Sequence, residues 1–247
     1  MSRAMGEYIS GRNAVMELLK SGAAIDKIYL QRGDLQGSVK AIRAKAQDAS
    51  VPVVEVNRQK LEELAEGIKH QGVIAHVSGI NYYELEDMLE YAQSRGEPPF
   101  LVALDEIEDP HNTGAIIRTC EAAGVHGVFL SKRRSSGITQ TVHKSSAGAT
   151  AHMRIGKVNS MAELIMRMKE QNIWVFGADG DAQKSYLDAD YRGAVCLVIG
   201  NEGSGLGRLV KERCDDLVSL PMKGRVESLN ASNAAAILIY EVLRQNA

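Results

Sequence analysis

The segment DPHNTGAIIRTCEAAG, at residues 109–124, carries one arginine among small and apolar residues. At helical pitch Gly114, Arg118 and Glu121 share one face, so a notch of bare backbone lies one turn from a cation and a possible carboxylate partner. A positioned guanidinium can bind a phosphate or stabilise a developing negative charge. The alternative interpretation is an exposed Arg118–Glu121 ion pair on a surface helix. Other parts of the sequence are needed to choose between a functional guanidinium and a surface ion pair.

A second segment, IGNEGSGLG at residues 199–207, is rich in glycine and follows an apolar run. Glycine tolerates positive φ and lets a ligand approach the backbone, while Glu202 places a carboxylate just beyond the run. The segment is not a dinucleotide-binding fingerprint, because the spacing G-x-G-x-x-G fails at Arg208, and the chain has no Walker A sequence. It remains compatible with a ligand-binding turn of another kind.

A third segment, ESLNASNAAAILIYE at residues 227–241, starts with polar residues and continues as a long apolar helix. Ser228 or Asn230 is placed to cap this helix, because either side chain can accept a hydrogen bond from the first turn of the backbone. Capping alone would account for either residue. Two candidate caps leave room for a further role.

The elements that must position these segments alternate between helix and strand. In the first 78 residues, periodicity predicts strands at 25–30, 51–56 and 72–78 and helices at 11–22, 39–47 and 58–67. These elements would form a compact α/β unit. The next stretch, residues 79–99, reads as an acidic amphipathic helix closed by glycine and two prolines, which is typical of a connector.

A second alternation begins at residue 100. Apolar runs lie at 100–107, 127–133, 173–180, 194–203 and 216–222, with helices between them. Continuous apolar runs indicate strands buried on both faces of a mainly parallel sheet, in which ligand sites gather at the carboxyl ends of the strands. The three segments above and the turn at 178–181 all follow strand ends. We therefore expect them to converge. The first helix should begin at Asn112 or Thr113 as its cap.

Length and composition are those of a globular protein with one large or two modest domains: 247 residues, 45% hydrophobic and 24% charged. No apolar run is long enough to cross a bilayer, and the opening MSRAMGEYIS lacks the apolar stretch of a secretory signal. We therefore expect a cytoplasmic protein without a membrane partner. Three widely spaced cysteines form no C-x-x-C pair, which suits a reducing compartment and argues against a metal site.

The charge is unevenly distributed along the chain. The formal net charge of -2 would by itself argue against a nucleic-acid partner. However, no Asp or Glu occurs between residues 122 and 162, where the basic residues are Lys132, Arg133, Arg134, Lys144, Arg154 and Lys157. This tract is either a solvated face balanced by acids elsewhere in the fold or a footprint for a phosphate backbone.

Three stretches together resemble the signature motifs of one family. DPHNTGAIIRTCEAAG, LVIGNEGSGL and LPMKGRVESLNASNAAAILIYE, in this order, are similar to the motifs of the SpoU (TrmH) class of SPOUT RNA 2'-O-methyltransferases. HQGVIA and GRNAV resemble the N-terminal domain of the large-subunit rRNA branch. The resemblance implies an L30e-like α/β substrate-binding domain at 1–78, a linker at 79–96, and an α/β SPOUT catalytic domain at 97–247. The last would contain a mainly parallel sheet and a deep trefoil knot.

The resemblance also implies the partners and the site residues. S-adenosylmethionine is the expected cofactor, RNA rather than DNA the substrate, and the homodimer the functional form. Cofactor binding is assigned to Gly177, Ala178, Gly200, Asn201, Gly203, Met222, Ser228 and Leu229. Catalytic roles are assigned to Arg118, Asn112, Glu121, Glu202, Ser228 and Asn230. RNA binding is assigned to Lys132, Arg133, Arg134 and Lys144, which would border Arg118.

Arg118 cannot act as a base at ordinary pH, because a guanidinium stays protonated in proteins. Our hypothesis is that it binds the phosphate next to the target ribose and stabilises the developing alkoxide. The proton would pass to that phosphate, to solvent or to Glu202. Glu121, one turn further on, would orient the guanidinium.

The expected activity is 2'-O-methylation of a guanosine ribose in 23S rRNA. One alternative is a tRNA guanosine methyltransferase, against which the separate N-terminal domain argues. A second is a non-catalytic rRNA-binding factor of ribosome assembly, against which the joint presence of Asn112, Arg118, Ser228 and Asn230 argues. A nucleotide- or NAD-dependent metabolic enzyme is disfavoured by the failed fingerprint.

Overall fold

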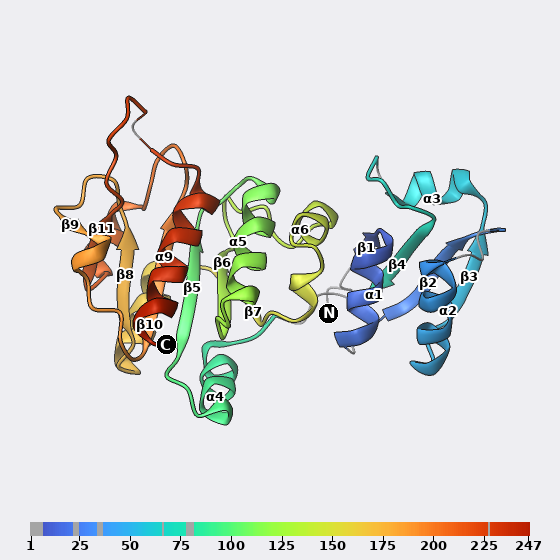
Figure 1. The fold of residues 1–247 in the computed structure, drawn as a ribbon, viewed down its shortest axis with the longest axis horizontal. Coiled ribbons are helices and arrows are strands. Elements are labelled where there is room, and N and C mark those ends of the chain that lie inside the picture. Colours follow the sequence, from blue (N-terminus) through green and yellow to red (C-terminus); the bar gives the residue numbers. More distant parts are fainter. Residues whose placement is uncertain (1–6, 22–24, 34–36, 66, 78–81, 227) are drawn as a thin grey trace. The chain divides into compact units, whose positions relative to one another are not determined.

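The computed structural model describes residues 7–21, 25–33, 37–65, 67–77, 82–226 and 228–247. Within these ranges the chain forms two compact units, drawn in Figure 1. The first comprises the described residues before 82 together with 138–152, and the second comprises 82–137 and 153–247. Ser78, at the end of an expected strand, and residues 79–81 of the expected linker lie outside the described ranges.

The first unit is built on a four-stranded sheet of order β1-β4-β2-β3, in which β4 is antiparallel to β1 and β2, and β2 is parallel to β3. Its strands are β1 (Glu7–Ser10), β2 (Ile25–Gln31), β3 (Val53–Val56) and β4 (Val73–Val77). Its helices are α1 (Arg12–Ser21), α2 (Ser38–Asp48), α3 (Arg58–Ala65), α6 (Gln140–Ser145) and the short 3-10 helix η1 (Ala149–Ala151). The expected strands and helices are present, and β1 is an additional strand.

The sheet of the first unit is covered on both faces, as the alternation along β4 shows. Val73 and Ala75 pack into the main core with α1 and α2. Ile74 points the other way and packs against Leu61 and Ala65 of α3. Successive residues of a strand face opposite sides, so one short strand supplies both cores.

The segment 138–152 belongs to the first unit, where α6 contacts β1 and η1 contacts α1. His143 of α6 is buried, and its Nδ1 lies 2.5 Å from the Thr150 hydroxyl. Its Nε2 has no hydrogen-bond partner among the described residues. Burial lowers the pKa of His143 to about 4, because the charged imidazolium would be desolvated.

We expect acid to destabilise the chain through His143. The folded pKa lies below the ordinary value, so the unfolded chain binds the extra proton first, and stability is lost as pH falls from about 6.5 towards 4. The loss over this window should be on the order of 3 kcal/mol. Urea unfolding of wild type and His143→Gln at pH 7 and pH 4 measures it. An equal acid-induced loss in both proteins would contradict the assignment.

The second unit contains a seven-stranded sheet of order β7-β6-β5-β10-β8-β11-β9, in which neighbouring strands are parallel. Its strands are β5 (Phe100–Asp105), β6 (Gly127–Ser131), β7 (Ile155–Val158), β8 (Trp174–Ala178), β9 (Lys184–Ser185), β10 (Val195–Gly200) and β11 (Asp216–Ser219). Its helices are α4 (Leu85–Arg95), α5 (Pro110–Ala122), α7 (Met161–Glu170), α8 (Arg208–Arg213), α9 (Ala231–Gln245) and the 3-10 helix η2 (Tyr186–Asp188). The expectation of a mainly parallel, doubly covered sheet is confirmed.

Helices cover both faces of this sheet. Cys196 and Val198 of β10 pack in one core with residues of α4, α7 and α8. Leu197, between them, faces the opposite side, where α5 and α9 lie side by side (Figure 1). Cys120 and Cys196 are buried and Cys214 is half-buried, and all three thiols are free.

The expectation that the acidic helix after residue 79 is only a connector is wrong. It is α4, and its Leu85 and Met88 are buried in the core of the second unit. The Met88 side chain lies against Gly127 so closely that a Cβ there would stand 1.9 Å from its sulfur. The apolar face of the amphipathic helix thus packs on the sheet, while its acidic residues face outward.

No helix of the described ranges is both long and apolar enough to cross a membrane. The same residues contain no group of three or more His, Cys, Asp or Glu side chains arranged to hold a metal ion.

Candidate functional site

The order in which the chain adds strands to the sheet changes direction between the neighbouring strands β5 and β10. β5, β6 and β7 extend the sheet one way, and β10, β8, β11 and β9 extend it the other way. Ligands bind such sheets outside the carboxyl ends of the strands at this switch point. The polar turns predicted from the sequence all follow the carboxyl ends of strands in this sheet.

A cavity of about 150 Å³ lies at this edge. It is lined by residues that follow β8, β10 and β11 and by the start of α9: Ala178, Asp179, Gly180, Ile199, Gly200, Asn201, Glu202, Gly205, Val218, Leu220, Met222, Ser228, Leu229, Ala231, Ala234 and Leu238. Turns from distant parts of the sequence therefore form one site.

Most of the residues expected to bind a cofactor line this cavity: Ala178, Gly200, Asn201, Met222, Ser228 and Leu229. Gly177 and Gly203 do not. Gly177 is buried within β8, where a Cβ would stand 2.7 Å from Leu217 and 2.8 Å from Leu206. Gly203 donates its backbone N–H to the Asn201 side chain at 2.8 Å. Gly177 therefore packs behind the cavity, and Gly203 belongs to the exposed part of the glycine-rich turn.

The glycine-rich turn is held by Asn201. Its Nδ2 donates to the Glu106 carbonyl at 3.0 Å, and its Oδ1 accepts the N–H of Gly203. The turn folds back onto the end of β10, so a Cβ on Gly200 would stand 2.5 Å from the carbonyl carbon of Gly205. Only glycine fits at this position, because the obstacle is backbone rather than a movable side chain.

Polar side chains link all three motifs in one chain of hydrogen bonds. Asn112 of α5 donates through Nδ2 to the Glu202 carboxylate. Its Oδ1 accepts from Asn230 Nδ2 at 2.9 Å. The Oδ1 of Asn230 in turn accepts from the Ser232 backbone N–H at 2.9 Å and from the Ser232 hydroxyl. Because each group has its partner, the network holds Glu202 in a defined position.

Asn112 can play this part because it does not cap its helix. The structure overturns the expectation that Asn112 or Thr113 is the cap: α5 begins at Pro110, and the Asp109 side chain accepts the His111 N–H at 2.9 Å. Proline is favoured in the first turn, where its missing N–H costs nothing. Asn112 and Thr113 consequently lie on the buried face of the helix. Asn230, one of the two expected caps, does cap α9.

Arg118 and Glu121 lie apart from this cavity within the chain. Both side chains are exposed on α5, and neither makes a hydrogen bond or ion pair with the part of the chain that the structure describes. The surface ion pair considered from the sequence is therefore not formed. The carboxylate does not orient the guanidinium in this single copy.

The basic residues divide between the two units. Lys132, Arg133 and Arg134 follow β6 in the second unit and are exposed. Arg134 pairs with Glu106 at 3.2 Å, beside the carbonyl that holds Asn201. Lys144 lies on α6 in the first unit.

Sequence reasoning missed several contributors to the site. Leu220 and Leu238 line the cavity. Asp105, at the end of β5, accepts the Gly207 N–H at 3.3 Å and so holds the far end of the glycine-rich turn. Burial raises the pKa of Asp105, and the hydrogen bond from Gly207 opposes this effect. An acidic residue that closes a fully apolar strand is the signal that could have found it.

Comparisons with known proteins agree with this geometry. The model of the SpoU rRNA methylase family matches residues 99–240, and that of the RNA 2'-O ribose methyltransferase substrate-binding domain matches residues 8–83. YacO of Bacillus subtilis, which bears the name of a TrmH family tRNA/rRNA methyltransferase, is 44% identical over 97% of this chain and 96% of its own length. A relative of the same name in Staphylococcus haemolyticus is 40% identical over 96% and 95%.

Solved structures are similar over nearly the whole chain. The SpoU methyltransferase AviRb of Streptomyces viridochromogenes, in complex with AdoMet, superposes with a TM-score of 0.86 at 25% identity, covering 99% of this chain and 91% of AviRb. An AdoMet-bound rRNA methyltransferase of Sinorhizobium meliloti gives 0.81 at 25% identity, covering 97% and 87%. The chain belongs to the SpoU (TrmH) family of RNA methyltransferases, whose cofactor is S-adenosylmethionine.

Proposed function

We propose that this chain methylates the 2'-oxygen of a guanosine ribose in 23S rRNA, in the cytoplasm and as a homodimer. The observation that carries the proposal is the cavity at the switch point, where the Asn112–Glu202–Asn230 network joins the three motifs. The match of residues 8–83 to a 2'-O ribose methyltransferase substrate-binding domain supports the ribose oxygen as the acceptor. The separate first unit, which we propose to be L30e-like, supports a large structured RNA.

The cavity fits S-adenosylmethionine. Leu220, Met222 and Leu238 offer apolar walls for a flat adenine, and the bare Gly200 lets a ligand approach the backbone. Ser228 and Asn201 add polar groups. When bound, the cofactor supplies an electrophilic methyl group. We propose that the β10–α8 turn and the β11–α9 connection, which wall this cavity, form the trefoil knot.

Arg118 requires a second copy of the chain in this proposal. It is exposed on α5, next to α9, whose Ile237, Tyr240 and Leu243 are exposed apolar residues spaced three apart. This spacing places them along one face of the helix, which would be covered in a homodimer. The guanidinium would then reach the site of the partner subunit, where it binds the phosphate beside the target ribose and stabilises the alkoxide.

The proton of the ribose hydroxyl needs an acceptor near the site. Glu202 is anchored through one carboxylate oxygen by Asn112. Its second oxygen remains able to accept a proton, as can the neighbouring phosphate or solvent. Ser228, at the cavity wall, and Asn230, through Asn112, would position the reacting groups.

Mapping of 2'-O-methyl groups on ribosomal and transfer RNA, from cells with and without the gene, tests the proposed function. We expect one guanosine of 23S rRNA to lose its methyl group. Loss of a tRNA methyl group instead would establish the alternative substrate. No change in either RNA, together with retained rRNA binding, would support a non-catalytic assembly factor and overturn the proposal.

RNA binding should depend strongly on salt if the basic tract contacts phosphates. The log–log slope of affinity against salt should be about -0.7 for each phosphate contacted on single-stranded RNA. Exchanging Lys132 and Arg133 together for Gln should make this slope less negative by about 1.4. Filter binding from 50 to 300 mM salt, roughly the range that separates such slopes, is the measurement. Arg192→Gln, on a surface pair with Asp190, is the control.

A further inference from the structure

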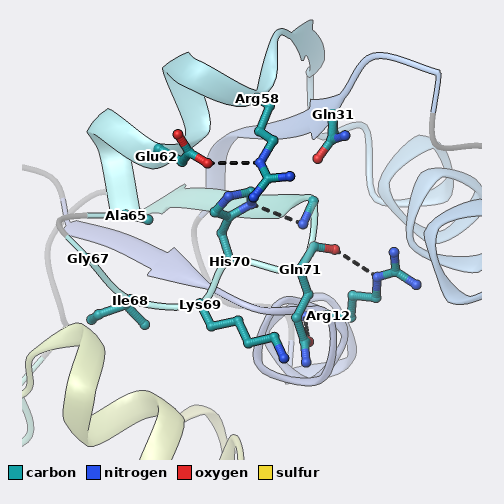
Figure 2. A pocket seen from close by; sticks show the side chains of 11 residues that line it. Arg12, Gln31, Arg58, Glu62, Ala65, Gly67, Ile68, Lys69, His70 and Gln71 are labelled. Carbon is teal, nitrogen blue, oxygen red and sulfur yellow. Dashed lines mark hydrogen bonds and ion pairs between the residues drawn. The ribbon is translucent and has the colours of Figure 1, made fainter.

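The first unit contains a cavity that the reaction chemistry does not explain. It has a volume of about 420 Å³ and lies between the start of α1, the end of β2, helix α3 and the turn 67–72 (Figure 2). The residues that reach into it with polar groups are Arg12, Gln31, Arg58, Lys69, His70 and Gln71. One acid, Glu62, faces three cations there, so the cavity is electropositive.

The turn that forms one wall is held in an unusual conformation. Gln71 has a φ of 52°, in the left-handed region that non-glycine residues avoid. Arg12 keeps it there: its Nε donates to the Gln71 carbonyl at 2.8 Å, and its backbone N–H donates to Gln71 Oε1 at 3.2 Å. Strained residues that are held in this way gather where a binding surface needs a fixed shape.

His70 presents a defined hydrogen-bond donor in this cavity. The Gly72 N–H donates to its Nδ1 at 3.0 Å, so in the neutral ring the proton resides on Nε2. Partial burial lowers the pKa of His70, because the charged ring would be desolvated, and the ring is therefore neutral at pH 7. Nε2 has no partner among the described residues. A neutral N–H of fixed direction suits the polar edge of a base rather than a phosphate.

Arg58 lies near His70 and helps to lower its pKa, and Lys69 precedes His70 in the same turn. Arg58 pairs with Glu62, with 2.8 Å between Nε and the carboxylate, which leaves its outer nitrogens available to a ligand. Lys69 makes no ion pair or hydrogen bond within the described ranges. These are phosphate-binding groups. The Arg58 side chain is 74% exposed, so the cavity is open to a polymer, whereas sites for free metabolites enclose their ligand.

We propose that this cavity holds one unpaired nucleotide of the RNA substrate, with its phosphate against Lys69 and Arg58 and the edge of its base against His70. The inference rests on the proposed function. It assigns to the first unit a specific contact with a splayed base, the manner in which RNA sequence is usually read. The cavity would thereby select which RNA the second unit methylates.

The test is a double variant, Lys69→Gln with His70→Asn, in the full chain. Asn can still accept the Gly72 N–H, so the turn is retained while the charge and the Nε2 donor are lost. Steady-state methylation of in vitro transcribed 23S rRNA should show KM for RNA raised roughly 10- to 100-fold, with kcat and KM for S-adenosylmethionine within about twofold. Filter binding of the same RNA should weaken by the same factor.

The matched control is Lys60→Gln, which removes a charge from the outer face of α3, where Lys60 pairs with Glu63. It should leave KM for RNA within about twofold of wild type. If the double variant does not fold, Lys69→Glu alone is tested instead. Lys69 is exposed and makes no hydrogen bond or ion pair within the described ranges, so this single substitution should leave the fold intact.

Two outcomes would overturn the inference. One is an unchanged KM and RNA affinity in folded Lys69 variants of an active enzyme. The other is micromolar binding of guanosine or uridine monophosphate that is lost in the variants while RNA kinetics stay unchanged, which would make the cavity a metabolite site. If wild type methylates neither rRNA nor tRNA, the proposed function fails instead, and direct RNA binding by the variants still decides the inference.

Discussion

Replacing Arg118 by Ala should lower kcat for RNA methylation about 100- to 1000-fold, the usual loss when one preorganised donor to a developing oxyanion is removed. Affinity for S-adenosylmethionine should stay unchanged, because Arg118 does not line the cofactor cavity. Single-turnover methylation and calorimetry measure the two quantities. Arg167→Ala, which removes an exposed helix arginine from its pair with Glu86, is the control. Turnover within a few-fold of wild type would contradict the assignment of Arg118 as the group that stabilises the alkoxide.

A mixing experiment tests whether Arg118 acts across the dimer. Arg118→Ala is combined with Gly200→Ala, and activity is compared with wild type at a cofactor concentration near the wild-type Kd, at which the weakened Gly200→Ala cavity is mostly empty. If the arginine serves the partner's site, random mixing gives heterodimers with one complete site, and activity returns to about a quarter of wild type. If it serves its own subunit, no site is complete and activity stays at background. Absence of rescue in verified heterodimers contradicts the proposed arrangement.

Gly200→Ala should weaken S-adenosylmethionine binding by a factor on the order of 10 to 100, corresponding to about 1–3 kcal/mol of overpacking. The reason is local: the added Cβ would stand 2.5 Å from the Gly205 carbonyl carbon and 2.6 Å from the Leu206 nitrogen. The turn that carries Asn201 and Glu202 must move away, and the cavity wall moves with it. Isothermal calorimetry of the folded variant is the direct measurement.

The control for this substitution is Gly224→Ala. Gly224 lies in the connection between β11 and α9, and a Cβ there meets no atom within 4 Å. Its cofactor affinity should equal that of wild type. Wild-type affinity in Gly200→Ala would mean that the glycine-rich turn does not shape the cofactor site.

The Asn112–Glu202–Asn230 network explains why residues that could be simple caps or surface groups belong to one site. Asn230 does cap α9 with its Oδ1, yet its Nδ2 still reaches Asn112. One amide thus serves both roles, because its oxygen and nitrogen point in different directions. Each of the three motifs, considered alone, predicts only the start of a helix or a turn.

The sequence by itself determined the parallel sheet, the convergence of the polar turns and all strands except β1, β7 and β9. These features follow from local periodicity and from the rule that parallel strands share a carboxyl edge. The family resemblance assigned Ala178, Met222 and Leu229 to the cofactor site, and all three line the cavity. The tertiary structure decided what depends on long-range packing: the burial of α4, the pairing of β1 with β4, and the place of residues 138–152 in the first unit. It also decided that Asp109 caps α5, that Asn112 points towards Glu202 and that Arg118 lies outside the cavity. Local sequence fixes which residues share a helix face, but only contacts with distant strands settle which face turns towards the site.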